Sequence, residues 1–365
     1  MCEQGLTQVS ITLSMELVGV KYQGFVGGYN QGAFAIGTCV VGLVAYLIRR
    51  WRMLHLVTSL LIIPQFFVYW FVIPESPRWL ISKHKWKSFR KVINKGFKMN
   101  QSRLPQNVLI PNEDVQSKEK LDNNSIGEAK EQISWGVIFT SKILVSRTCI
   151  MLLDWGIVAL VYYGAGMSAT LLGGNIFLNF FLVAAVEVAA NIVILFFINN
   201  WGRKASLVFG FLVSGIGCCT LGFLSDLDST AALVMLLLGK FGASFAFTAI
   251  YITTNELFPT SIRNTAVGTC SLFSRLFSMT APYISQYLPA VTYNQAPFLV
   301  FGVSGLVGCV CSVFLPESLG HPLPDTMQDA ADMNKYSKSI FSWWSKEKLE
   351  KNIENRLKER HKRNN

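Results

Sequence analysis

Long apolar stretches alternate with short polar stretches along most of this chain. A helical apolar stretch of about 20 residues matches the thickness of the hydrocarbon core of a bilayer. We predict nine such helices, at residues 6–18, 25–48, 53–73, 148–167, 175–198, 206–224, 231–254, 267–288 and 298–315. The first of them is short and only moderately apolar. The pattern therefore predicts an all-α polytopic membrane protein.

Two hydrophilic segments divide the chain into four parts. The predicted parts are 1–80 with three spans, 81–147 as a loop, 148–318 with six spans, and 319–365 as a tail. Within the loop, residues 82–100 indicate a basic surface helix and residues 101–124 a flexible linker. In the tail, Leu349, Ile353 and Leu357 are spaced by four, which suits a basic amphipathic helix. A solvated helix or an unstructured tail is an equal alternative.

Composition supports the membrane interpretation and explains the net charge. The chain is 51% hydrophobic and 15% charged, whereas soluble domains carry about 25% charged residues. Most lysines and arginines behind the net charge of +11 lie in the loop and the tail. The positive-inside rule places both segments in the cytoplasm, so nucleic acid is not needed as a partner. The cysteines do not form a disulfide framework and fall mostly in apolar stretches, as small core residues do. The histidines have no metal-ligand spacing, and no catalytic set is evident, so we expect no metal, no cofactor and no enzyme.

An internal repeat relates the two groups of spans. Glu16 and Glu256 each close an apolar stretch, and each half reaches Pro-Glu-Ser two spans later, at Glu75 and Glu317. The separations, 59 and 61 residues, are nearly equal. Parallel repeats of this kind occur in membrane transporters. Three spans precede that of Glu256, and none precedes that of Glu16, so we expect the first three of twelve helices to be missing. An incomplete sequence, a splice form and a genuine short paralogue remain open.

Three motifs carry a resemblance to a known family. They are GKFGASFAFTAIYITTNELFPTSIRNTAVG at residues 239–268, PESPRWLI at residues 74–81 and LPESLGHPLPDT at residues 315–326. With them, residues 5–330 resemble the organic cation, anion and zwitterion transporters of solute carrier family 22, a branch of the major facilitator superfamily. The last motif is most similar to the carnitine (novel organic cation) branch. Asn199 and Asn200 depart from the family, which usually has an acidic–basic pair there.

The resemblance implies a major facilitator bundle with about nine of an expected twelve transmembrane helices. It implies transport of small organic ions, carnitine-like zwitterions or organic cations, by alternating access. The implied partners are that substrate, the lipid bilayer and a coupling cation, and the implied location is the plasma membrane. The alternative is a truncated, non-transporting membrane paralogue that binds partners.

Charged residues inside the spans are the sharpest functional signal. A charge at the bilayer centre costs about 2.5–3.5 kcal/mol on insertion scales, so such residues line cavities or pair. Asp154, Glu187, Lys240 and Arg275 are four of this kind, and Asp154 lies early in its span. By resemblance, Glu187 attracts a cationic head group or a coupling cation; the alternative is a buried salt bridge to Lys240 or Arg275.

Arg275 stands where anion- and carnitine-type family members have arginine and classical cation carriers have aspartate. Its planar guanidinium suits a carboxylate. Asn191 stands near the position of a lysine in organic anion members, which argues against a strongly anionic preference. Glu187 with Arg275 therefore suits a zwitterion. Lys240 is typical of the family, and gating and structural roles remain open for it.

Trp155, Tyr162 and Tyr163 are predicted to form an aromatic wall that holds a quaternary ammonium group by cation–π contact. Trp155 and Tyr162 match aromatic cavity positions of the family, and ordinary helix packing is the alternative. A second set of charged residues is predicted to form a cytoplasmic gate, with simple topology anchoring as its alternative. The gate candidates are Glu16, Lys21, Glu75, Arg78, Arg203, Glu256 and Arg263.

Overall fold

The computed structural model describes residues 2–18, 23–71, 73–82, 85–101, 142–169, 175–223, 229–259, 262–319 and 324. These residues form helices joined by turns, and no strand occurs among them. The linker predicted at residues 101–124, apart from Gln101, and the predicted amphipathic helix of the tail lie outside the described residues. Within the basic segment predicted as a surface helix at residues 82–100, the structure has one helix, α6 (Trp86–Met99).

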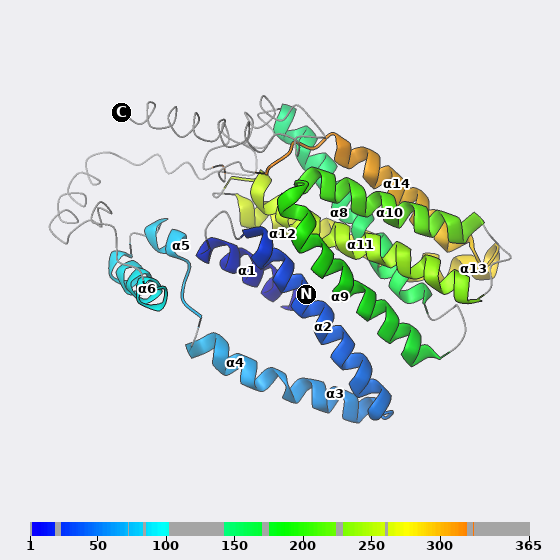
Figure 1. The fold of residues 1–365 in the computed structure, drawn as a ribbon, viewed down its shortest axis with the longest axis horizontal. Helices are drawn as coiled ribbons and strands as arrows, with labels where there is room; N and C mark the ends of the chain where they lie inside the picture. Colours follow the sequence, from blue (N-terminus) through cyan, green and yellow to red (C-terminus); the bar gives the residue numbers. More distant parts are fainter. Residues whose placement is uncertain are drawn as a thin grey trace.

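Fourteen helical segments follow one another along the described chain. They are α1 (Cys2–Leu17), α2 (Gln23–Leu47), α3 (Trp51–Leu60), α4 (Ile62–Phe71), α5 (Pro77–Ser82), α6 (Trp86–Met99), α8 (Lys142–Ser168), α9 (Ile176–Asn200), α10 (Arg203–Phe223), α11 (Ser229–Leu257), α12 (Arg263–Pro282), η3 (Tyr283–Tyr287), α13 (Leu288–Val291) and α14 (Ala296–Val313). Figure 1 shows the longer ones as a bundle whose axes run in similar directions.

Six helices of the described chain are long and apolar enough to cross a bilayer. They are Phe25–Leu47, Leu144–Ser168, Ile176–Ile198, Arg203–Phe223, Thr230–Leu257 and Ala296–Val313. Each coincides with one of the nine predicted spans to within a few residues. The chain is therefore a multi-pass membrane protein, with an exposed apolar surface that suits contact with lipid.

The other three predicted spans are helical but shorter or interrupted. The first corresponds to α1, which has 16 residues. The span predicted at 53–73 is divided at Leu61 into α3 and α4, because Pro64 has no N–H to continue the hydrogen-bond ladder. The span predicted at 267–288 passes from α12 into the π-helix η3 directly after Pro282. Such π-helical turns are rare and frequently lie at functional sites.

Small residues bring the helices of the second half close together. A Cβ atom on Gly210 of α10 would lie 2.7 Å from the backbone nitrogen of Ala246 on α11. A Cβ atom on Gly217 would lie 2.7 Å from the backbone nitrogen of Gly239, also on α11. Any side chain at these positions would push the backbones apart, and membrane helices use small residues for this purpose. The α10–α11 contact is therefore backbone against backbone.

The first half joins the second half mainly through α2. This helix packs along α9 and also contacts α11, while α1 contacts α2 and α12. In Figure 1, α3 and α4 lie at the margin of the molecule, away from α10 and α14. Their apolar side chains are largely exposed, with Trp51 at 67% and Phe71 at 74%. The core of the molecule therefore lies among α8 to α14, with α1 and α2 against one side.

Candidate functional site

A pocket lies between the two halves of the molecule. Its lining comes from α1 and α2 on one side and from α8, α9, α11 and α12 on the other. The lining residues are Thr7, Gln31, Phe34, Tyr162, Tyr163, Glu187, Asn191, Ser244, Phe247, Thr248, Tyr251 and Arg275. Three of the five predicted substrate-binding residues, Tyr162, Glu187 and Arg275, thus share one pocket.

Glu187 is held by two partners within the second half. One carboxylate oxygen accepts a 2.5 Å hydrogen bond from the Tyr162 hydroxyl, and the other lies 3.7 Å from the Lys240 ammonium. The same ammonium donates to the Tyr162 carbonyl at 3.2 Å and lies over the Tyr162 ring, 3.1 Å from its centroid. All three side chains are buried. The buried salt bridge to Lys240, one alternative from the sequence, is therefore formed, and the charge of Glu187 is neutralised inside the protein.

Asn191 connects the two halves at this pocket. Its side-chain amide donates to the backbone carbonyl of Gln31 on α2 at 3.5 Å and to that of Glu187 at 3.0 Å. Its carbonyl accepts a 2.6 Å hydrogen bond from the Thr248 hydroxyl on α11. The neutral side chain of Asn191 therefore links α2, α9 and α11, at the place where α2 packs along α9.

Arg275 reaches the pocket from α12, and its hydrogen-bond partner there is a tyrosine hydroxyl. Its guanidinium donates to the Tyr163 hydroxyl at 2.8 Å and lies 5.5 Å from the centroid of that ring. Its Nε atom has no hydrogen-bond partner among the described residues. Within that part of the chain, no carboxylate lies within salt-bridge distance of Arg275. The pocket therefore presents a guanidinium whose charge is not matched by an acidic side chain.

An aromatic wall is present, but Trp155 supports it from behind. Tyr162 lies 5.1 Å from Tyr163 and 4.9 Å from Phe247, measured between ring centroids. Phe247 lies 5.5 Å from Tyr251. Trp155 is fully buried, packs 4.5 Å from Tyr251 and donates its indole N–H to the Thr254 hydroxyl. Trp155 does not line the pocket. In this structure it would therefore not contact a substrate bound there.

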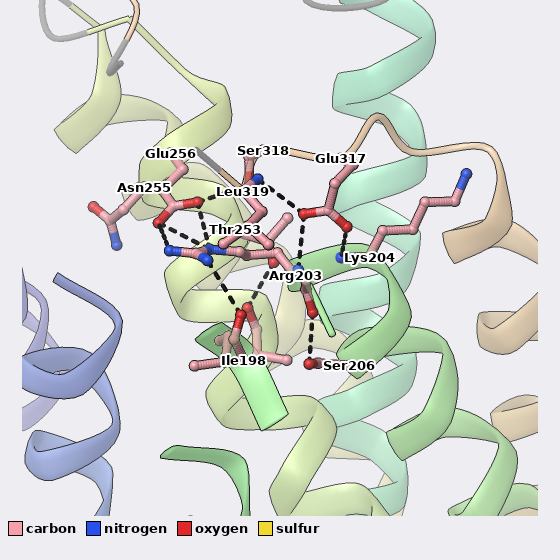
Figure 2. A network of polar contacts seen from close by, with 12 residues as sticks. Ile198, Arg203, Lys204, Ser206, Thr253, Asn255, Glu256, Glu317, Ser318 and Leu319 are labelled. Carbon is pink, nitrogen blue, oxygen red and sulfur yellow. Dashed lines mark hydrogen bonds and ion pairs between the residues drawn. The ribbon is translucent and has the colours of Figure 1, made fainter. Parts of the chain in front are cut away.

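A second polar cluster lies at the end of the bundle at which α10 begins (Figure 2). Arg203 binds Glu256 through two nitrogens, with contacts of 2.9 Å from Nε and 3.0 Å from Nη2. Arg203 also donates to the backbone carbonyl of Ile198, and Ser318 donates to Glu256 at 2.7 Å. Because Arg203, Glu256 and Ser318 are buried, this cluster is a desolvated ion pair with its hydrogen bonds largely met.

Glu317 caps the start of α10. Its carboxylate accepts from the backbone N–H groups of Arg203 and Lys204, at 2.9 and 3.1 Å, and from that of Leu319 (Figure 2). A carboxylate at this position also balances the positive end of the helix dipole. Burial raises the pKa of the Glu317 carboxyl, and the N–H donors partly oppose that rise. Gly202, with a φ of +99°, forms the turn before α10 and lies next to this carboxylate.

The first half repeats part of this cluster. Ser76 donates to Glu16 at 2.5 Å, as Ser318 donates to Glu256 in the second half. Glu75 is exposed, and Arg263 is buried at the first position of α12. Arg78 lies on α5, with its side chain outside the described atoms, and Lys21 is outside the described residues altogether.

Asp154 is deeply buried between α8 and α14. One carboxylate oxygen accepts a 2.9 Å hydrogen bond from Ser312, and the other has no hydrogen-bond partner among the described residues. The side chain is 0% exposed. It is not part of the pocket lining, so Asp154 belongs to the packing of the second half.

Sequence reasoning missed several residues of the pocket and one of the polar cluster at the start of α10. Phe247 and Tyr251 lie on the same helix face as Thr248, in the motif that carried the family resemblance, and that spacing was a usable signal. Glu317 was paired with Glu75 in the repeat but was not named for the gate. The pocket residues on α1 and α2, Thr7, Gln31 and Phe34, carry no charge and had no sequence signal.

The long apolar helices define a multi-pass membrane protein, and their bundle has the major facilitator superfamily fold. The structure of the proton:xylose symporter XylE bound to 6-bromo-6-deoxy-D-glucose matches with a TM-score of 0.67 at 20% identity, covering 91% of this chain and 71% of that chain. The family model described as "Sugar (and other) transporter" matches residues 5–329. The chain belongs to this transporter family. The matched families are transporters and not enzymes.

Curated relatives are members of solute carrier family 22 and organic cation transporters. Solute carrier family 22 member 15 of Xenopus tropicalis is 34% identical over 339 residues, covering 89% of this chain and 59% of that protein. Member 2 of Oryctolagus cuniculus is 32% identical, covering 91% and 58%. An organic cation transporter-like protein of Drosophila melanogaster is 29% identical, covering 92% and 59%. The chain thus spans about three-fifths of the length of these relatives.

Proposed function

We propose that this protein is a plasma-membrane transporter of small organic ions that works by alternating access. Its similarity to solute carrier family 22 proteins supports the class. Carnitine-like zwitterions are the proposed substrates, and a coupling cation is a further proposed partner. The pocket lies where two helix groups meet, as expected of a site that rocking opens to each side in turn.

The observation that carries the substrate class is the state of the two opposite charges in the pocket. Glu187 is already neutralised by Lys240, whereas Arg275 has a neutral phenol as its hydrogen-bond partner. A guanidinium in such a site binds a carboxylate through two parallel hydrogen bonds. The Tyr162 ring already has the Lys240 ammonium over it. The rings of Phe247 and Tyr251, which also line the pocket, offer the negative quadrupole that attracts a quaternary ammonium. A carboxylate and an ammonium on one small molecule fit this pair of features.

The polar cluster at the start of α10 is proposed as the gate at the cytoplasmic end. The ion pair between Arg203 and Glu256 connects α10 to α11, and Ser318 adds the segment after α14. Gating would require at least one of these contacts to exchange with water during the cycle. The hydrogen bond between Ser76 and Glu16 is proposed as its counterpart in the first half.

Uptake measurements test the proposal. Cells that express the chain receive labelled carnitine or labelled tetraethylammonium, which has no carboxylate. We expect saturable carnitine uptake that falls about tenfold or more in Arg275→Gln, because a hydrogen bond to a charged group is worth about 1.5–3 kcal/mol. Arg275→Lys retains the charge without the fork and is expected to fall between the two.

Surface biotinylation provides the control for delivery of each variant to the membrane. Equal carnitine uptake by the parent chain and Arg275→Gln would reject carboxylate recognition by Arg275. Uptake of tetraethylammonium alone would reject the zwitterion and retain the transporter. Absence of any uptake by a chain that reaches the surface would favour the alternative, a membrane protein that does not transport.

A further inference from the structure

The helix α6 (Trp86–Met99) is amphipathic and has no role in the pocket or the polar clusters. At 100° per residue, Lys87, Lys91, Lys95 and Lys98 fall within one quarter of its circumference. The opposite face carries the large apolar side chains, which are Trp86, Phe89, Ile93 and Phe97. The helix thus carries a lysine face opposite an aromatic face, and Arg90 lies at the edge of the aromatic face.

The charge of this region has a single sign. No aspartate or glutamate occurs between Ser82 and Gln101, while lysine and arginine recur from Lys83 to Lys98. The four lysines of the basic face are exposed. A surface of this kind is complementary to a layer of negative charge, and a soluble protein partner would have to supply that charge in an equally extended form.

The apolar face is only half covered. Trp86, Phe89, Ile93 and Phe97 are half-buried, and no residue of α6 is fully buried. Within the described chain, α6 packs mainly against the short helix α5. Lys85, which precedes α6, lies 4.6 Å from the ring centroid of Trp79 on α5. Tryptophan rings and lysines placed together in this way are typical of the membrane–water interface.

The placement of α6 agrees with a surface position. Figure 1 shows α6 nearly end-on, whereas α2, α9 and α11 run across the view, so its axis crosses those of the membrane-spanning helices. Its length, about 21 Å at 1.5 Å per residue, would then lie along the bilayer surface. It follows the apolar helix α4 (Ile62–Phe71) after 14 residues, which keeps it close to the membrane.

We propose that α6 binds the surface of a bilayer that contains anionic lipid, with its lysines on the headgroups and its aromatic face in the interface. Basic amphipathic helices bind in this orientation through buried apolar area and attraction to acidic headgroups. Lysines near such a surface are attracted to the negative potential of its headgroups. The helix would then anchor the loop between the two halves, whether or not the chain transports.

Hydrogen exchange of the full chain in lipid nanodiscs tests the proposal. One set of discs contains phosphatidylcholine alone, and the other contains phosphatidylcholine mixed with phosphatidylserine. We expect the amides of residues 86–99 to exchange about tenfold or more slowly in the anionic discs, given the attraction per lysine. The difference should largely vanish near 1 M salt, where the Debye length is about 3 Å.

Two charge variants make the test specific. Replacing Lys87, Lys91, Lys95 and Lys98 by glutamine removes the charge but keeps helix propensity nearly unchanged, and should abolish the slowing. Replacing the same four residues by arginine keeps the charge and should preserve it. Equal exchange rates of residues 86–99 in the two kinds of disc would overturn the proposal. So would slower exchange in the anionic discs that persists in the glutamine variant. Polyglutamate added to phosphatidylcholine discs serves as a model of an acidic protein partner. If it slows exchange of residues 86–99 as much as the anionic discs do, the proposal is overturned in favour of such a partner.

Discussion

Glu187 and Lys240 form a pair in which neither charge can be removed without leaving the other buried. Their side chains are 7% and 4% exposed, so water cannot solvate the remaining partner. Breaking a buried ion pair by removal of one member costs about 3–5 kcal/mol. This pairing also means that Glu187 binds a substrate cation only if Lys240 moves away from it.

A double-mutant cycle tests the pair. Glu187→Gln and Lys240→Met should each lower the thermal stability of the purified protein. The double variant should be more stable than the sum of the two effects predicts, by about 1–3 kcal/mol, as coupled residues are. Melting followed by fluorescence-detected size exclusion measures all four proteins. Strictly additive losses would mean that the two side chains do not interact.

Sequence reasoning located Glu187 and Arg275, the charged residues of the described pocket lining, and Lys240 beside them, but not their pairing. Glu187, Lys240 and Arg275 were singled out because charges inside apolar spans are costly, and that argument needs no structure. Which cation neutralises Glu187 depends on helix rotation and depth, so Lys240 and Arg275 could not be distinguished. Trp155 was assigned to the wall because it is aromatic and matches an aromatic cavity position of the family, whereas the structure buries it against Tyr251.

At the scale of the element, the turn before α10 depends on a glycine. Gly202 has a φ of +99°, in the region that side chains with a Cβ rarely adopt. A Cβ atom there would also lie 2.5 Å from a Glu317 carboxylate oxygen. The capping of α10 by Glu317 and the turn at Gly202 therefore require one another.

The substitution Gly202→Ala tests this dependence. We expect it to lower stability by about 1–2 kcal/mol for the backbone conformation alone, and further because Glu317 must shift away from the N–H groups that it accepts from. The matched control is Gly37→Ala in α2, where an added Cβ meets no atom within 4 Å. Thermal melting of the two variants should differ in sign or in size. Equal melting temperatures would contradict the role of Gly202.

Element boundaries were predictable where apolar length decided them. Six predicted spans coincide with helices that can cross a bilayer, because about 20 apolar residues have few alternatives to a membrane helix. Local backbone features were not predictable in the same way. The division at Leu61 comes three residues before Pro64, and the π-helix at Tyr283–Tyr287 comes directly after Pro282. The effect of a proline on a helix ranges from a mild kink to a break.

At the scale of the whole molecule, alternating access requires α2 to move relative to α9. A Cβ atom on Gly32 of α2 would lie 3.8 Å from the Cβ atom of Asn191 on α9. This separation equals the mean Cβ–Cβ distance of about 3.8 Å in disulfides. The two positions therefore offer a covalent means of holding the two halves together at the pocket.

The double variant Gly32→Cys, Asn191→Cys tests the motion. We expect oxidation to stop substrate uptake and reduction to restore it, because the disulfide prevents α2 from separating from α9. Uptake by the reduced double variant is the baseline, since Asn191 also makes hydrogen bonds that the substitution removes. Each single cysteine variant, treated with the same oxidant, controls for the native cysteines. Full uptake after verified cross-linking would contradict motion at this contact.

The backbone contact between α10 and α11 limits which substitutions the sequence can accept. At Gly210 and Gly217 the neighbouring backbone excludes every side chain, so substitutions there meet a rigid obstacle. Along α3 no residue is buried, and any apolar side chain of suitable length satisfies lipid equally well. Among related sequences, variation should therefore accumulate on the outer faces of α3 and α4 and be nearly absent at Gly210 and Gly217 of α10.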